Sequence, residues 1–402
     1  MRYYCRSPHF RKTEPMSQQE NDTKADTGIY VHIPFCQSKC PYCDFYSITD
    51  TSRIPEFLKA LKVEMKLAAT TGTRADTLYI GGGTPSLLTP KQMGLIVDWA
   101  AACFNLDPTA EMTLEINPAT ATKRDLQDYA AFGFNRLNIG VQSFNDQNLA
   151  FLGRRHSADQ ALAAVRAGVD AGFTNIGLDL IFGLPDQATG TWKNDLLQAI
   201  RLAPKHLACY MLSYEPHTPL HQDMQSGRIV PLSELRTADL FRMTHDFLGV
   251  AGYEHYEVSN YAQNSRWRSR HNQKYWNFVP YFGLGPSAHS FNPPERRWNH
   301  RSLDDYLKAV SQGRLPVSDQ EYLSEEQQMI ESLFLGLRQS DGIDFIRFQN
   351  RFHSDFRLYF HTALDRFSAE GWIEMDDQRC RLTVEGMLFL DRIVEELVDM
   401  IN

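Results

Sequence analysis

The chain has 402 residues, of which 43% are hydrophobic and 22% are charged, the proportions of a globular protein with a large core. Its formal net charge of −8 gives no electrostatic footprint for nucleic acid, so DNA- and RNA-binding functions are disfavoured. No apolar run approaches the roughly 20 residues that span a bilayer, and we therefore predict no transmembrane helix.

The first 27 residues are polar and contain no apolar stretch of the kind that a secretory signal needs. We expect them to form a disordered leader, and Met16 within it is a candidate start. The seven cysteines of the chain argue for a reducing compartment rather than for a disulfide framework. We therefore expect a cytoplasmic protein.

Residues 28–214 alternate between short apolar runs and stretches of helical periodicity. Strand runs that are apolar on both faces and alternate with helices are typical of a parallel sheet. We count six β/α units and predict an α/β fold, an open partial (β/α)6 barrel over residues 28–265. The predicted strands are GIYVHI (28–33), DTLYIGG (76–82), MTLEIN (112–117), RLNIGVQ (136–142), NIGLDLIFG (175–183) and HLACYMLSY (206–214). The predicted helices cover residues 54–69, 90–103, 122–132, 158–171 and 191–202.

The remainder of the chain has a different character. Residues 266–321 are rich in aromatic side chains and arginine, and we expect them to form a connector. Residues 322–402 show helical periodicity, then the stretch GWIEMDDQRCRLTVEG, which we predict to be a hairpin, and a last amphipathic helix. This order predicts a winged-helix-like module. This module has 8 basic and 16 acidic residues and would repel a phosphate backbone, so we interpret it as a lid or partner surface.

The chemically distinctive residues stand at the ends of successive predicted strands. In barrels of this kind, chemistry gathers at the carboxyl ends of the strands, so these residues should face one rim. They are the cysteine loop after the first strand, GGGTP (81–85) after the second, Glu115 at the end of the third, Gln142 at the end of the fourth, Arg154 in the loop after the fourth, and Asp179 in the fifth.

The cysteine loop, HIPFCQSKCPYCDF, places Cys36, Cys40 and Cys43 within eight positions. A structural zinc site with His32 as fourth ligand is one interpretation. However, His32 belongs to the predicted strand rather than to the loop, and no second pair of ligands is apparent. The other interpretation is a 4Fe–4S cluster, in which three thiolates leave one iron open to an exchangeable ligand.

This spacing after the first strand of a partial barrel resembles the radical S-adenosylmethionine (SAM) superfamily. The resemblance implies that Cys36, Cys40 and Cys43 bind a 4Fe–4S cluster. In that superfamily SAM chelates the open iron and is cleaved by electron transfer to a 5′-deoxyadenosyl radical, and for this chain both cleavage and simple binding of SAM stay open. The protein would then position the reactants and exclude water and oxygen.

Five longer stretches narrow the resemblance: YVHIPFCQSKCPYCDF, GGGTPSLL, LNIGVQSFND, GLDLIFGLP and FGLGPSAHSF. They are similar to oxygen-independent coproporphyrinogen III oxidase, HemN, and its relatives, from Tyr30 to the C-terminus. The resemblance implies that Tyr30 and Glu115 contact the cluster-bound SAM. It implies that the other SAM contacts, which in the oxidase partly serve a second SAM molecule, are Tyr42, Gly82, Gly83, Thr84, Gln142, Arg154 and Asp179.

The sequence departs from the oxidase at Phe45, where the oxidase has a fourth cysteine. Together with HNQKYW (271–276), this resembles the HemW branch of the family, whose members are haem chaperones. The resemblance implies haem binding by His271, Tyr275 and Trp276, with the histidine, expected outside the barrel mouth, as a candidate iron ligand. Arg266, Arg268 and Arg270 could pair with the haem propionates. The competing interpretation of HNQKYW is a polar turn over a buried aromatic anchor.

The function that we predict is that of a haem chaperone, which binds haem and transfers it to acceptor haem proteins. The alternative is an enzyme, either a coproporphyrinogen III oxidase or another radical enzyme acting on a tetrapyrrole. A third class, a zinc-stabilised interaction protein, requires that iron be absent. A homodimer and transient membrane association stay open.

Overall fold

The structure is a computed structural model that describes residues 27–70 and 72–401. The predicted leader lies outside the described residues except for Thr27, which begins the first strand. Among the described helices, none is both long and apolar enough to cross a membrane.

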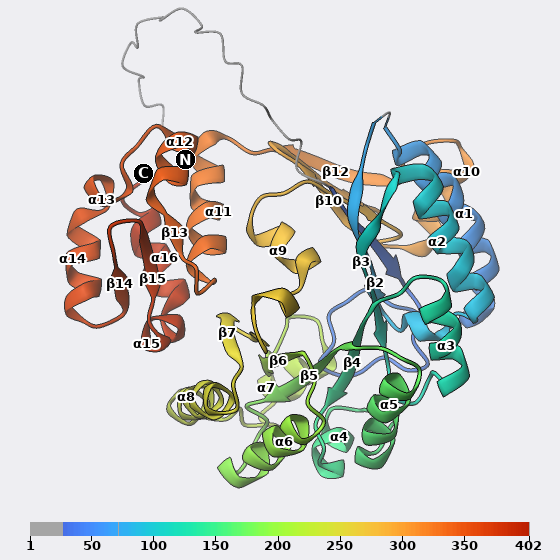
Figure 1. Ribbon diagram of the computed structural model, residues 1–402, viewed down its shortest axis with the longest axis horizontal. Coiled ribbons are helices and arrows are strands. Elements are labelled where there is room, and N and C mark those ends of the chain that lie inside the picture. Colours follow the sequence, from blue (N-terminus) through green and yellow to red (C-terminus); the bar gives the residue numbers. More distant parts are fainter. Residues whose placement is uncertain (1–26, 71, 402) are drawn as a thin grey trace, which may run out of the picture.

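A twelve-stranded sheet forms the frame of the larger part of the molecule (Figure 1). Its strands lie in the order β12-β11-β10-β9-β1-β2-β3-β4-β5-β6-β8-β7, and the run from β9 to β6 is parallel throughout. These strands are β1 (Thr27–Ile33), β2 (Ala75–Gly82), β3 (Leu106–Ile116), β4 (Arg136–Gln142), β5 (Asn175–Phe182), β6 (His206–Met211), β7 (Glu254–Glu257), β8 (Asn260–Ala262), β9 (Tyr281–Leu284), β10 (His289–Asn292), β11 (Glu295–Asn299) and β12 (Val317–Tyr322).

The six predicted parallel strands are confirmed, and a seventh lies beside them. Strand β9 pairs with β1 in parallel, from Gly28 opposite Tyr281 to Val31 opposite Leu284. It comes from the segment that we had expected to be a connector, and β10, β11 and β12 extend the same sheet in antiparallel fashion. With only four residues, β9 is too short to show a strand period in the sequence.

The helices that follow the parallel strands cover the outer face of the sheet (Figure 1). Three of these helices start with a reciprocal capping box, such as that of Thr89 and Gln92. The capping side chains therefore determine where these helices begin. Helix α4, which we did not predict, is capped by Asn145. The helices of this part are α1 (Ile54–Ala68), α2 (Pro90–Phe104), α3 (Lys123–Ala131), α4 (Asp146–Phe151), α5 (Ala158–Asp170), α6 (Thr189–Arg201), α7 (Pro219–Gln225), α8 (Glu234–Val250), α9 (Arg270–Trp276) and α10 (Leu303–Ser311).

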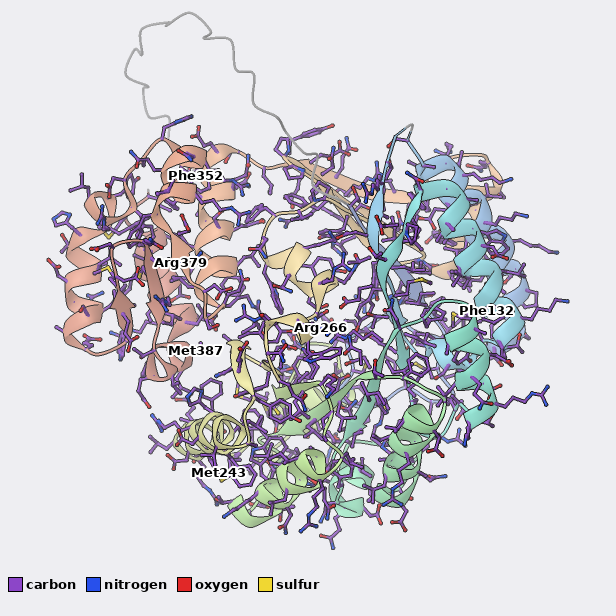
Figure 2. The ribbon with its side chains drawn as sticks, viewed as in Figure 1. Phe132, Met243, Arg266, Phe352, Arg379 and Met387 are labelled. Atoms are coloured by element: carbon purple, nitrogen blue, oxygen red, sulfur yellow. The ribbon has the colours of Figure 1, made fainter. Side chains whose placement is uncertain are left out.

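The C-terminal module packs helices around a small three-stranded sheet of order β13-β15-β14. The predicted hairpin is confirmed, because β14 and β15 pair in antiparallel fashion. Buried phenylalanines, of which Figure 2 labels Phe352, form the core of this module. Its elements are α11 (Glu325–Leu337), β13 (Ile343–Asp344), α12 (Phe345–Phe352), α13 (Phe356–Tyr359), α14 (His361–Ala369), β14 (Ile373–Met375), β15 (Arg379–Leu382), α15 (Val384–Leu388) and α16 (Leu390–Val398).

Helix α9 is one of the elements that contact both parts. It lies on the opposite side of the sheet from α1 and α2, between β2 and α11 (Figure 1). Because α9 consists of Arg270–Trp276, the fold carries HNQKYW to the inside of the barrel rather than to its edge.

Candidate functional site

A cavity of about 1010 Å³ opens at the carboxyl ends of the parallel strands. All the residues that we predicted to hold the cluster or SAM line this one cavity, so the predicted convergence on one rim is confirmed. They are Tyr30, Cys36, Cys40, Tyr42, Cys43, Gly82, Gly83, Thr84, Glu115, Gln142, Arg154 and Asp179.

Two backbone hydrogen bonds just after β1 close the base of the cysteine loop. The amide of Cys36 donates to the Ile48 carbonyl at 2.9 Å, and the amide of Ile48 donates back to the Pro34 carbonyl at 2.8 Å. The hydroxyl of Thr84, in the glycine segment GGGTP, lies 3.5 Å from Cys36 Sγ. These contacts fix the loop against the end of the glycine segment.

The thiols of the loop are free and half-buried, as a cluster site requires. Burial raises the pKa of the Cys43 thiol to about 11, a cost that binding of its thiolate to iron would offset. Arg154 Nη1 lies 3.8 Å from Cys40 Sγ and places a positive charge beside the thiols. Three thiolates without a fourth protein ligand fit a 4Fe–4S cluster with one open iron.

His32 does not fit the alternative zinc site. It is buried in β1, and both of its ring nitrogens have hydrogen-bond partners, the Tyr46 carbonyl at 2.8 Å and the Tyr30 hydroxyl at 3.1 Å. Within residues 27–70 and 72–401, no three His, Cys, Asp or Glu side chains are arranged to hold a single metal ion.

The glycine segment runs close to groups that leave no space for side chains. A Cβ on Gly81 would lie 2.9 Å from the Glu115 carboxyl, and one on Gly82 would lie 2.6 Å from the ring of His32. Gly82 also has a φ of +106°, which side chains rarely tolerate, and its amide donates to Glu115 at 3.1 Å. The segment therefore presents bare backbone to the cavity, as close approach of a ligand requires.

The carboxyl groups at the strand ends are held by neighbouring donors. Tyr79 donates to Glu115 at 2.7 Å, and Asn138 donates to Asp179 at 2.7 Å. Burial raises the pKa of Glu115 to about 7 and that of Asp179 to about 6.

Two polar atoms beside these carboxyl groups lack partners. Asp179 Oδ1 and Arg154 Nε are buried without a hydrogen-bond partner among the described residues. Buried polar atoms are normally paired, so these two atoms fit the hydroxyl, amino and carboxylate groups of a bound SAM.

The HNQKYW segment lies deeper than we expected. We had placed His271 outside the barrel mouth, but the structure corrects this, because the residue is only 1% exposed and forms part of the inner wall of the cavity. Its Nδ1 pairs with the Thr77 hydroxyl at 2.8 Å and its Nε2 with the Tyr275 hydroxyl at 2.8 Å. Since Thr77 stands near the amino end of β2, α9 closes the cavity at the end opposite the cysteine loop.

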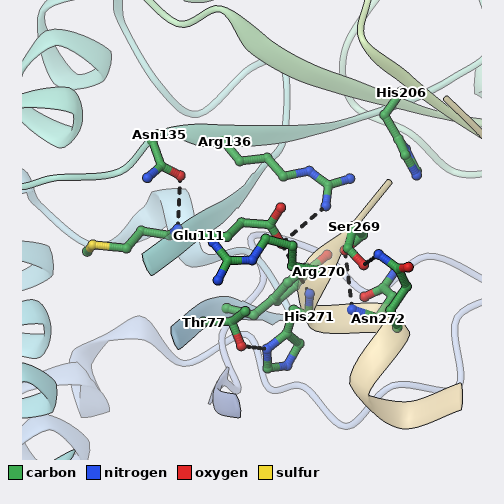
Figure 3. A network of polar contacts seen from close by, with 12 residues as sticks. Thr77, Glu111, Asn135, Arg136, His206, Ser269, Arg270, His271 and Asn272 are labelled. Carbon is green, nitrogen blue, oxygen red and sulfur yellow. Dashed lines mark hydrogen bonds and ion pairs between the residues drawn. The ribbon is translucent and has the colours of Figure 1, made fainter. Parts of the chain in front are cut away.

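A buried polar network anchors the start of α9 (Figure 3). The amide of His271 donates to Glu111 Oε1 at 3.1 Å, and Arg136 Nη1 lies 3.7 Å from the same oxygen. Burial and the positive charges of Lys274 and Arg136 lower the pKa of His271 to about 3, so its ring is neutral at pH 7.

The three arginines upstream of the motif do not face the cavity. Arg268 pairs with Asp341 at 2.8 Å, and Arg270 pairs with Asp76 at 3.0 Å. Arg266 lies over the Trp267 ring, on the segment that leads into α9 (Figure 2). The expected pairing of these arginines with propionates would require them to leave these partners.

Trp276 faces away from the other two motif residues. His271 and Tyr275 line the large cavity, whereas Trp276 lines a crevice of about 70 Å³ between α9 and the C-terminal module, beside Phe348 and Arg351. The motif therefore has one side toward the cavity and one side toward the module.

We did not predict several of the residues that line the cavity. Tyr79 and Asn138 point inward from β2 and β4, where strands apolar on both faces give no signal for the inner side. Strand β9 adds Tyr281 and β10 adds His289, and both depend on the unpredicted pairing of β9 with β1. At the mouth, the exposed cations are Lys39, Arg155 and Arg301.

Replacing Gly82 by Ala should weaken SAM binding without removing the cluster. The new Cβ would collide with His32 and force a backbone angle that alanine resists, which would move the amide away from Glu115. The measurement is the SAM-induced change in the electron paramagnetic resonance spectrum of the reduced cluster. Gly190→Ala is the matched control, because a Cβ at Gly190 meets nothing within 4 Å. Wild-type SAM binding by Gly82→Ala would contradict the assignment.

Comparisons with known proteins match this geometry. The model of the radical SAM superfamily matches residues 30–196, and that of the HemN C-terminal domain matches residues 323–389. The heme chaperone HemW of Synechocystis sp. is 33% identical, covering 92% of this chain and 96% of the relative. The heme chaperone HemW of Escherichia coli is 34% identical, covering 92% and 97%.

Among solved structures, the coproporphyrinogen III oxidase HemN of Escherichia coli, a radical SAM enzyme, superposes with a TM-score of 0.81. The match covers 92% of this chain and 90% of that chain at 23% sequence identity. At this identity the match establishes the shared fold, and the predicted partial barrel with its C-terminal module is confirmed.

Proposed function

This chain belongs to the HemW family of radical SAM proteins, and we propose that it binds haem and transfers it to acceptor haem proteins. The observation that carries the proposal is the position of α9. The helix that contains HNQKYW forms a wall of the same cavity that the cysteine loop borders. Haem handling and the radical SAM site would therefore share one chamber.

In this proposal Cys36, Cys40 and Cys43 hold the 4Fe–4S cluster, and the glycine segment with Glu115 holds SAM. The cluster, when bound, supplies an electron to the sulfonium of SAM. The chain itself presents the bare backbone of Gly82 and the acceptor oxygens of Glu115 to the ligand.

The remaining lining of the cavity suits haem. The tyrosine rings that the strands and α9 contribute to its wall offer flat apolar surfaces to a macrocycle, and they are Tyr30, Tyr79, Tyr210, Tyr275 and Tyr281. We propose that Lys39, Arg155 and Arg301 at the mouth attract the propionates, in place of the three arginines upstream of α9. His271 contributes by orienting Tyr275 through their 2.8 Å hydrogen bond.

The alternative function is oxidative decarboxylation of coproporphyrinogen III, which the shared cavity and SAM residues favour. Phe45 speaks against it. This side chain stands where the oxidase has a cysteine, is 67% exposed and borders the cavity mouth, so it offers an apolar contact instead of a thiol. We propose a cytoplasmic setting, which the free thiols of the described cysteines support.

Haem transfer tests the proposal. The anaerobically reconstituted protein is loaded with haem and mixed with an apo-cytochrome of the b type, and the absorption of the holo-cytochrome is followed. We expect transfer to be faster than the release of haem to an excess of a passive scavenger, apomyoglobin. Equal rates for the two acceptors would mean that haem merely dissociates, which would contradict the proposed chaperone function.

A further inference from the structure

Three histidines line the large cavity: His32, His271 and His289. Histidine ligates haem iron through a ring nitrogen whose lone pair is accessible. The three can therefore be compared by what their ring nitrogens already contact.

Two of the three have both ring nitrogens occupied. His32 pairs with Tyr30 and the Tyr46 carbonyl, and it is 4% exposed. His271 pairs with Thr77 and Tyr275, and it is 1% exposed. To bind iron, either residue would have to break a buried hydrogen bond and leave a polar partner unsatisfied, which is unfavourable.

His289 differs from the other two histidines both in its exposure and in the contacts of its ring nitrogens. The His289 side chain is exposed, and within the described part of the chain its ring nitrogens make no hydrogen bond or ion pair. Its ring stacks on Trp298 of the neighbouring strand, with centroids 5.8 Å apart and planes inclined by 26°. The stacking orients the ring and leaves its nitrogens accessible.

The backbone of His289 is held firmly on the cavity wall. Gly283 approaches it so closely that a Cβ on the glycine would lie 1.9 Å from the His289 carbonyl oxygen. The Gly283 amide donates to the hydroxyl of Ser290 at 2.9 Å, and Gly283 pairs with Tyr30 of β1. His289 therefore stands at the level of Tyr30, above His271 and nearer the mouth.

The surroundings of His289 favour the neutral form of its ring. Partial shielding of the ring from water and the positive charge of Arg296 lower its pKa, while Glu321 opposes them more weakly. A neutral imidazole is the form that ligates iron.

We propose that the imidazole of His289 is an axial ligand of the bound haem iron, with His271 supporting the wall behind it. The inference rests on the proposed function and adds the residue that holds the metal. An exposed ligand supported by one stacking contact is accessible to an incoming acceptor protein, so a ligand on the acceptor can replace it. This property suits transfer better than a ligand buried in the network of α9.

The test uses the full, anaerobically reconstituted chain titrated with hemin. His289→Ala should lower haem affinity by roughly tenfold or more and remove the nitrogen-ligand signature from the electron paramagnetic resonance spectrum of the ferric haem. Free imidazole should restore that signature. His300→Ala, a histidine of the same region that does not line the cavity, should behave as wild type. His271→Ala should keep the nitrogen-ligand signature.

The outcomes separate this inference from the proposed function. Loss of the signature in His271→Ala but not in His289→Ala would overturn the inference in favour of His271. A wild-type haem without any nitrogen ligand would overturn it in favour of another side chain, and in both cases haem binding itself would stand. No haem binding by the wild type would overturn the proposed function and this inference with it.

Discussion

Replacing Cys36, Cys40 or Cys43 by serine should abolish the brown colour of the anaerobically purified protein. The three thiols are the cysteine side chains that border the cavity, and each would supply one of the cluster's protein ligands. A hydroxyl binds iron more weakly than a thiolate, so loss of one ligand should reduce the content from about four iron and four sulfide per chain to a small remainder. Iron and sulfide analysis together with absorption spectra provide the measurement.

The other cysteines provide matched controls. Cys103 lies in α2 and Cys380 in β15, and neither borders the cavity. Cys103→Ser and Cys380→Ser should therefore keep the full cluster content. Stoichiometric zinc without iron after reconstitution would contradict the cluster assignment and restore the zinc interpretation.

Replacing Arg136 by Met should destabilise the folded protein by about 3–5 kcal/mol. Arg136 is 2% exposed, and its partner Glu111 is 7% exposed, so the substitution leaves a buried carboxylate without its cation. Glu111 also accepts the amide of His271, and the damage should spread to the start of α9. Thermal denaturation followed by circular dichroism measures the loss.

The solvent-exposed ion pair of Lys123 and Asp170 is the control for the buried pair of Arg136 and Glu111. Their atoms lie 3.2 Å apart, but the side chains are 51% and 59% exposed, so Lys123→Ala should cost less than about 1 kcal/mol. Arg136→Met combined with Glu111→Gln should recover part of the loss, since no charge is then left unpaired. Equal effects of Arg136→Met and Lys123→Ala would show that the buried network does not anchor α9.

The residues at the rim of the barrel could be predicted because each strand and each helix leaves a pattern in its own stretch of sequence. Alternating apolar runs and helices predict parallel strands, and parallel strands bring their carboxyl ends to one edge. Glu115 and Asp179 therefore converge on the cysteine loop although they are far apart in the sequence.

The inner end of the cavity could not be predicted in the same way. The position of α9 depends on contacts of His271 with Thr77 of β2 and Glu111 of β3. These residues are 194 and 160 positions away in the sequence, so the contacts leave no periodic signal. Strand β9 is equally inconspicuous in the sequence, and without it His289 reads as one more polar residue in a turn. The sequence therefore favoured His271 as the haem ligand, but both of its ring nitrogens have hydrogen-bond partners in the structure.

The central claim, that the chain handles haem and does not decarboxylate coproporphyrinogen III, is tested most directly on one sample. The protein is purified without oxygen, reconstituted with iron and sulfide, and divided into two portions. One portion is titrated with hemin, and the other is incubated with coproporphyrinogen III, SAM and a reductant. We predict saturable haem binding in the first portion and no protoporphyrinogen in the second. Turnover of coproporphyrinogen III without saturable haem binding would contradict the account.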